Sequence, residues 1–118
     1  MRVYQHTDSP WRCGHWNGSP IEILVMPDIM TRIPPGEAYH YHPFHEYYIV
    51  LQGRATLFVE ETSVPLEAGM IVMVQPGERH RVTWVDPQIG VRWVLVKERG
   101  DPNGNIVLPE PELGGDDV

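Results

Sequence analysis

Short runs of β-branched and aromatic residues, separated by turn residues, occupy most of the chain between positions 21 and 97. Several runs alternate apolar and polar residues, which is the period of a strand with one buried face. No segment repeats apolar residues at helical spacing over three turns. The pattern predicts nine strands: Ile21–Met26, Ile29–Ile33, Ala38–His42, Tyr47–Leu51, Ala55–Glu60, Ser63–Leu66, Met70–Val74, His80–Val85 and Gly90–Lys97.

Turn residues separate these runs at regular intervals, for example Pro34-Pro35-Gly36 and Gln52-Gly53. Short strands at such spacing favour an all-β, antiparallel sandwich or barrel with little helix. The 12 prolines and 11 glycines in 118 residues suit many turns, and this length suits one domain. We expect an irregular segment or edge strand over residues 1–20, a barrel over 21–99 and an acidic, flexible tail over 100–118.

Charge and cysteine content exclude several classes of protein. The formal net charge is −7, and much of it lies in the tail, whose acids are Asp101, Glu110, Glu112, Asp116 and Asp117. Because no basic stripe is present, nucleic acid is not an expected partner. The apolar runs are too short to span a membrane, and the N-terminus lacks the apolar core of a signal peptide. Cys13 is the single cysteine, so we expect a cytoplasmic protein without an intrachain disulfide.

Three histidines and one glutamate stand at spacings that suit a metal site on strands. His40 and His42 are two residues apart, so their rings leave the same face of an extended strand. Glu46 precedes the next run, and His80 follows a Pro-Gly turn at the start of another. A closed barrel can bring all four side chains to one interior point. Such a donor set suits one divalent transition metal, with Mn, Fe, Ni, Zn and Cu all open.

Two segments carry a family resemblance. Residues 40–53, HYHPFHEYYIVLQG, resemble the first conserved motif of the cupin superfamily, and residues 69–80, GMIVMVQPGERH, resemble the second. The resemblance implies a double-stranded β-helix, or jelly-roll barrel, that binds one metal ion. Carried over to this chain, the ligands are His40, His42, Glu46 and His80. It leaves the chemistry open, because cupins include oxygenases, isomerases, epimerases, sugar-binding sensors and storage proteins.

Other side chains near the motifs have two possible roles each. Tyr48 can face inward and offer a hydroxyl to a ligand, or can simply fill the barrel. Arg32 and Arg92 are candidate counter-charges for an anionic substrate, although a solvated arginine is the commoner outcome. His45 is turned away from the site by strand parity, and Glu37 or Tyr48 could transfer protons.

The remaining aromatic and histidine residues are interpreted as structural. We expect His6 and His15 to be solvated, and Trp84 and Trp93 to lie in the core or pocket wall. Trp11 and Trp16 could cover the barrel or pair across a two-fold axis in a homodimer.

Two functions from different classes fit these features. One is a metal-dependent enzyme for a small molecule, either an oxidoreductase such as a dioxygenase or an isomerase or epimerase. Four protein ligands on an octahedral ion leave two positions for water, substrate or dioxygen. The other is a non-catalytic small-molecule-binding or sensor protein. An acid, base or cation that faces the open positions of the metal would favour the enzyme.

Overall fold

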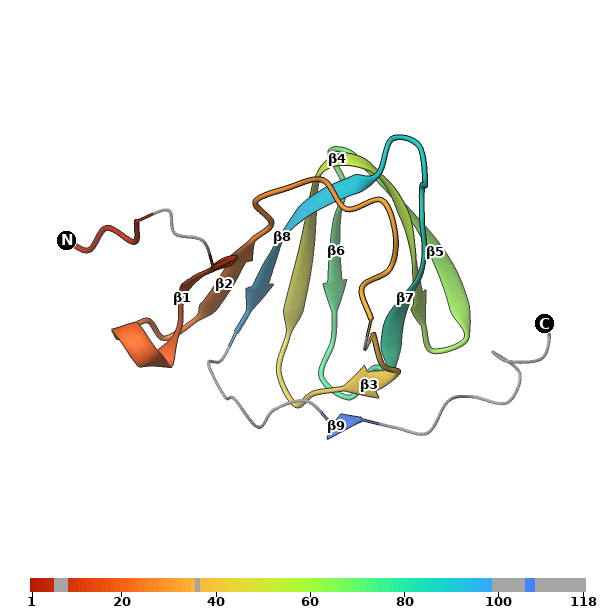
Figure 1. Cartoon of the computed structure of the whole chain (residues 1–118). Helices are drawn as coiled ribbons and strands as arrows, with labels where there is room; N and C mark the ends of the chain where they lie inside the picture. Colours follow the sequence, from red (N-terminus) through yellow and green to blue (C-terminus); the bar gives the residue numbers. More distant parts are fainter. Residues whose placement is uncertain (6–8, 36, 99–105, 108–118) are drawn as a thin grey trace.

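The computed structural model describes residues 1–5, 9–35, 37–98 and 106–107, and nearly all of its regular structure is strand (Figure 1). The elements are β1 (Trp11–Cys13), a 3-10 helix η1 (His15–Asn17), β2 (Glu22–Val25), β3 (His40–Tyr41), β4 (Glu46–Val59), β5 (Thr62–Glu67), β6 (Ile71–Val74), β7 (His80–Val85), β8 (Val91–Lys97) and β9 (Ile106–Val107). Every pair of neighbouring strands is antiparallel. The predicted all-β, antiparallel architecture with little helix is confirmed.

The strands form two sheets that share β4. The first sheet has the order β1-β2-β8-β4-β6, and the second has the order β5-β4-β7-β3-β9. In Figure 1 the two sheets lie on opposite sides of the barrel, and the segment from β2 to β3 passes from one to the other. Within the described residues, no helix has the length and apolar character needed to cross a bilayer.

β4 replaces two of the predicted strands, so the turn predicted at Gln52-Gly53 is wrong. A register shift opposite β8 falls between Val50 and Gln52, and Gly53, just beyond this bulge, has a φ of 81°. A Cβ on Gly53 would lie 1.8 Å from the carbonyl oxygen of Gly90, so only glycine fits. This bulge bends β4, and its first half joins the first sheet while its second half joins the other.

The strand predicted over Ile29–Ile33 is also wrong. Only Met30 forms a bridge there, with Val91 of β8. Pro27 and the Pro34-Pro35 pair lack the backbone N–H groups that a longer ladder would need. The next prediction, Ala38–His42, shortens to β3 for the two residues His40–Tyr41.

The core lies between the sheets and is built from alternate residues of the long strands, chiefly Tyr48, Val50, Leu57, Val74 and Trp93. Trp93 is 5% exposed, as predicted, but Trp84 is 44% exposed and lies outside the core.

A second bulge turns Trp84 outward. Leu57 of β4 lies opposite Val82, and Thr56 lies opposite Trp84, so β7 carries one extra residue, Thr83. The extra residue reverses the parity of the strand beyond it, which buries Val85 in place of Trp84.

The ends of the chain add short edge strands. β1 pairs with β2 at one edge of the first sheet. β9 pairs with β3, so residues 106–107 of the predicted flexible tail form a strand. The rest of that prediction, over 100–105 and 108–118, and the prediction for His6 lie outside the described residues.

Candidate metal centre

The structure brings the four predicted ligands together at one end of the barrel. Their candidate donor atoms all lie within 4.8 Å of one another. Register explains part of this, because His40 of β3 lies directly opposite His80 of β7. His42 and Glu46 flank the turn between β3 and β4. His42, Glu46 and His80 are buried, and His40 is half-buried.

Each of the three histidine rings is held by a backbone carbonyl two residues away. The Nδ1 atoms of His40, His42 and His80 lie 2.8, 3.2 and 2.9 Å from the carbonyl oxygens of Ala38, Phe44 and Glu78. A carbonyl oxygen only accepts hydrogen bonds, so Nδ1 carries the proton in each ring. The Nε2 lone pairs are then left for a cation, which is the tautomer that metal-binding histidines need.

Glu46 completes the cluster from the start of β4. Its Oε1 lies 2.9 Å from Nε2 of His42 and 3.1 Å from Nε2 of His80. At these distances the Nε2 lone pairs and the carboxylate oxygen repel each other unless a proton or a metal ion lies between them. Three imidazoles and a carboxylate suit a divalent transition metal, so the residues present fit such an ion.

The ionisation of the cluster also suits a metal ion. Burial alone would raise the pKa of Glu46, but the hydrogen bonds that His42 and His80 donate from Nε2 in their protonated forms, and the charges of protonated His80 and of Lys97, lower it to about 2. Burial lowers the pKa of His40 from its usual value, because the charged ring loses solvent. A carboxylate that stays ionised and an imidazole that stays neutral are the forms that bind metal.

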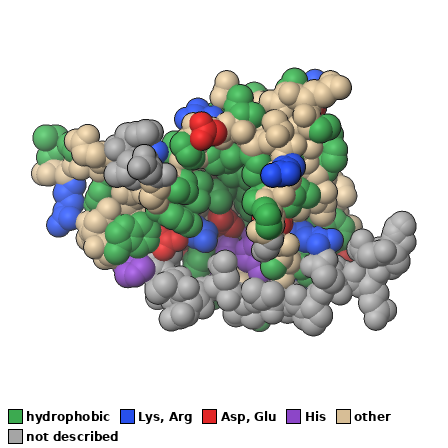
Figure 2. All heavy atoms as spheres, in the orientation of Figure 1, with side chains coloured by type: hydrophobic (Ala, Val, Ile, Leu, Met, Phe, Trp, Pro, Cys, Tyr) green, Lys and Arg blue, Asp and Glu red, His purple; other side chains and the backbone are tan. Residues whose placement is uncertain are grey.

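A cavity of about 400 Å³ opens between the sheets. It is lined by Pro10, Leu24, Met26, Pro27, Asp28, Ile29, Met30, Pro34, Glu37, Val82, Trp93 and Leu95. All of these side chains except Asp28 and Glu37 are apolar. Figure 2 shows a hollow lined by hydrophobic side chains, with acidic, basic and histidine side chains at its lower edge. The volume is within the range of small-molecule sites, which run from about 300 to 1,000 Å³.

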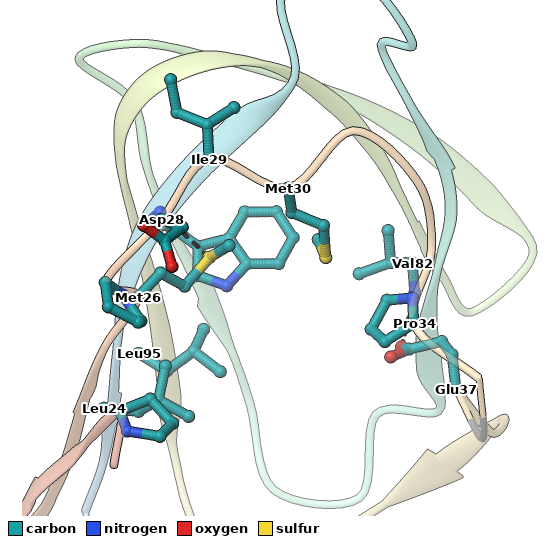
Figure 3. Close-up of a pocket in the computed structure, with 12 residues that line it drawn as sticks. Leu24, Met26, Asp28, Ile29, Met30, Pro34, Glu37, Val82 and Leu95 are labelled. Atoms are coloured by element: carbon teal, nitrogen blue, oxygen red, sulfur yellow. Dashed lines mark hydrogen bonds between the residues drawn. The ribbon is translucent and has the colours of Figure 1, made fainter. Parts of the chain in front are cut away.

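Glu37 connects the pocket with the metal centre. Its Oε2 accepts a hydrogen bond from the backbone N–H of Val82 at 2.9 Å, and Figure 3 shows its carboxylate directed into the pocket. Burial raises the pKa of Glu37, partly offset by that hydrogen bond. The charges of His80 and Glu46 also act on its pKa, in opposite directions. Glu37 is one of the two side chains that the sequence offers for proton transfer.

The other sequence candidates lie in different places. Tyr48 points inward and is 4% exposed, with its ring 6.5 Å from that of His80 between centroids. Burial raises its pKa well above the usual value, so the phenol stays neutral. Arg32 is exposed, and Arg92 donates from Nε to the carbonyl of Met26 at 2.8 Å. Neither arginine lines the cavity.

The surface histidines stay out of the cluster. His45 lies away from it, with Nδ1 2.9 Å from Oε1 of Glu98, as strand parity predicts. His15 is exposed in η1.

Sequence reasoning missed one cation, Lys97 at the end of β8. Lys97 lies directly opposite Glu46 of β4, so both side chains leave the same face of the sheet. Its Nζ lies 5.3 Å from the centroid of the Trp11 ring. The signal was present in the alternation of Val91, Trp93 and Leu95, which places Lys97 on the inward face of the same strand.

Solved structures with the same fold come from several kinds of protein. A candidate mannose-6-phosphate isomerase from Ralstonia eutropha JMP134 is 26% identical, with a TM-score of 0.54 over 66% of this chain and 73% of that one. A cupin protein from Bacteroides fragilis is 13% identical, with a TM-score of 0.61 over 94% and 97%. Oxalate decarboxylase from Bacillus subtilis is 19% identical, with a TM-score of 0.59 over 77% of this chain but only 25% of that one.

The sequence comparisons identify the family. No curated protein matches the chain significantly. The Cupin domain family matches residues 29–97, which include the four residues of the histidine and glutamate cluster and most of both sheets. More than half of the sequence is covered, and the fold and the paired motifs agree with the match. The chain therefore belongs to the cupin family.

Proposed function

We propose that this protein is a metal-dependent enzyme that acts on a small organic molecule. One divalent transition metal, of Mn, Fe, Ni, Zn or Cu, would be held by His40, His42, Glu46 and His80. The observation that carries the proposal is the set of three Nδ1 contacts with backbone carbonyls, which leaves three Nε2 lone pairs around one carboxylate. Such an ion would supply Lewis acidity and positions for substrate or dioxygen.

Glu37 favours an isomerase or epimerase over a dioxygenase. Isomerisation next to a carbonyl needs a group that removes a proton from carbon and returns it. A carboxylate in an apolar pocket, with a raised pKa and one oxygen fixed by the N–H of Val82, suits this role. The other carboxylate oxygen can then face a substrate in the cavity, in the direction that Figure 3 shows.

A non-catalytic binding or sensor function is the second candidate. The specific observation that favours it is the lining of the pocket, which apart from Asp28 and Glu37 consists of apolar side chains. An apolar pocket beside a metal ion can capture a ligand without changing it.

Three measurements test the metal site and separate these functions. Elemental analysis of protein purified without added metal should find about one transition-metal ion per chain. Small hydroxy and keto compounds should then be screened in deuterated water by NMR, with oxygen uptake recorded in parallel. Deuterium incorporation that is lost in Glu37→Gln, while metal content is unchanged, would support the isomerase.

The other outcomes are equally informative. Oxygen uptake without deuterium exchange would indicate a dioxygenase, and ligand binding without either would indicate a binding protein. Protein that holds no transition metal, even after one is added, would overturn the proposal.

A further inference from the structure

A row of charged side chains crosses the inner face of the first sheet. Lys97 of β8 lies directly opposite Glu22 of β2 on one side and Glu46 of β4 on the other. Residues directly opposite in antiparallel strands have Cβ atoms roughly 4.5–5.5 Å apart and share a face. Glu46 belongs to the metal-binding cluster, so Lys97 lies immediately beside the metal centre.

The next row on the same face is apolar. Leu95 of β8 lies directly opposite Leu24 of β2 on one side and Tyr48 of β4 on the other. Leu24 and Leu95 line the cavity. Lys97 is therefore at the boundary between the apolar pocket and the charged end of the barrel. In Figure 2, basic and histidine side chains meet the hydrophobic hollow at its lower edge.

The ammonium group of Lys97 contacts an aromatic ring and forms no ion pair within the described residues. Its contact is with the face of Trp11, at 5.3 Å from the ring centroid, which is a cation–π distance. Among the described residues it forms no ion pair with a carboxylate, although Glu22 and Glu46 flank it. A metal ion on Glu46 would take up that negative charge, so Glu22 would be the one flanking carboxylate with which a ligand shares the charge of Lys97.

We propose that Lys97 binds the anionic group of a small carboxylate ligand whose apolar part occupies the pocket. The proposal rests on the proposed function for the metal ion, which would attract the same carboxylate from its other side. A cation beside the metal centre and an apolar cavity of about 400 Å³ are complementary to a ligand with one charged end. Lys97 does not itself line the cavity but follows the lining residue Leu95 on the same face of β8, whereas Arg32 is exposed and Arg92 donates from Nε to the carbonyl of Met26.

The test compares carboxylates with their neutral amides. Calorimetric titration of the purified, metal-containing protein would use 4-methylpentanoate and phenylacetate, each paired with its amide. We expect wild type to prefer the acids. Lys97→Met keeps the packing on Trp11 but removes the charge, and should weaken acid binding about tenfold or more while amide binding stays unchanged. Lys97→Arg keeps the charge and should retain most of the preference.

The outcomes separate this proposal from the proposed function. Equal binding of acids in wild type and Lys97→Met, or no preference for acids in wild type, would overturn the role of Lys97 even when metal content is normal. The same titrations after chelation test Lys97 without the ion. A preference that persists there and depends on Lys97 would support the carboxylate site even if metal analysis contradicted the enzyme.

Discussion

At the scale of single residues, local backbone geometry prepares the histidines for metal binding. The rings of His40, His42 and His80 are all oriented by carbonyls two residues away. His45, one residue from Glu46, is instead paired with Glu98 at the surface. The spacing of the histidines was visible in the sequence. The carbonyl contacts were not, because they depend on how the backbone turns at each strand end.

Replacement of His42 by alanine tests the cluster directly. We expect His42→Ala to lose most of its bound metal, with affinity reduced by more than about 100-fold, since even changes outside the ligand shell cost about 10- to 100-fold. The barrel should remain folded, because the hydrophobic core is separate from the cluster. Elemental analysis and circular dichroism measure the two effects.

His45→Ala is the matched control for that experiment, since it removes a histidine from the same segment but outside the cluster. It should retain the metal. If His42→Ala unfolded at room temperature, the site would have to be regarded as structural.

Metal retention should also depend on pH, and the histidines should set the range. The pKa of Glu46 is about 2, so its carboxylate stays ionised throughout mildly acidic conditions. Protons compete with metal for the imidazoles, so affinity should fall as pH drops through about 6.5. Burial lowers the pKa of His40, which favours the neutral, metal-binding form of this ring. Full retention after dialysis at pH 4.5 would contradict a shell of three histidines.

At the scale of elements, two bulges decide which side chains face the interior. The bulge between Val50 and Gln52, followed by Gly53, keeps β4 continuous while it moves from one sheet to the other. The bulge on β7 turns Trp84 out and Val85 in. Sequence alternation cannot reveal either change, since Gln52-Gly53 is also a turn signal and a bulge adds one residue without a distinctive residue type.

Gly53 should therefore be far more sensitive to substitution than a glycine in an ordinary turn. Gly53→Ala places a Cβ 1.8 Å from the carbonyl oxygen of Gly90 and holds alanine at a φ of 81°, so we expect a loss of about 3 kcal/mol or more in unfolding free energy. Gly69 has a φ of 95° but nothing within 4 Å of an added Cβ, so Gly69→Ala should cost only about 1–2 kcal/mol. Urea denaturation measures the unfolding free energy of both variants. Equal losses in Gly53→Ala and Gly69→Ala would contradict the role of the bulge.

At the scale of the whole molecule, the features that could be predicted are those encoded by nearby residues. Alternating runs and the motifs at 40–53 and 69–80 are local, and they predicted the barrel and the four residues that meet in it. The position of Lys97 beside Glu46 depends on register between β8 and β4. The carboxylate of Glu37 is held at the pocket by a hydrogen bond from the backbone N–H of Val82 in β7. Pairings of this kind are set by the complete fold and leave no short pattern in the sequence.

The outer face of the first sheet bears on the expected homodimer. Apolar side chains cover it across four adjacent strands, namely Ile23, Val25, Tyr47, Ile49, Ile71, Met73, Val94 and Val96. An antiparallel sheet facing water normally carries polar residues there, and a broad apolar face is typical of an interaction site. The N-terminal aromatic residues are a weaker candidate, because Trp11 packs against Lys97 and Trp16 of its own chain.

If a second copy covers this face, charges placed on β6 should separate the two chains. Ile71 and Met73 are 64% and 43% exposed in the single chain, so Ile71→Lys combined with Met73→Lys should leave the fold intact. A two-fold interface would bring each lysine pair against the apolar face or the lysines of its partner. Light scattering should therefore give a dimer for wild type and a monomer for this variant.

The control for that experiment is Ile89→Lys. Ile89 is 51% exposed in the loop before β8, so this variant should stay dimeric. A monomeric wild type, or a double variant that remains dimeric, would exclude this face as the interface.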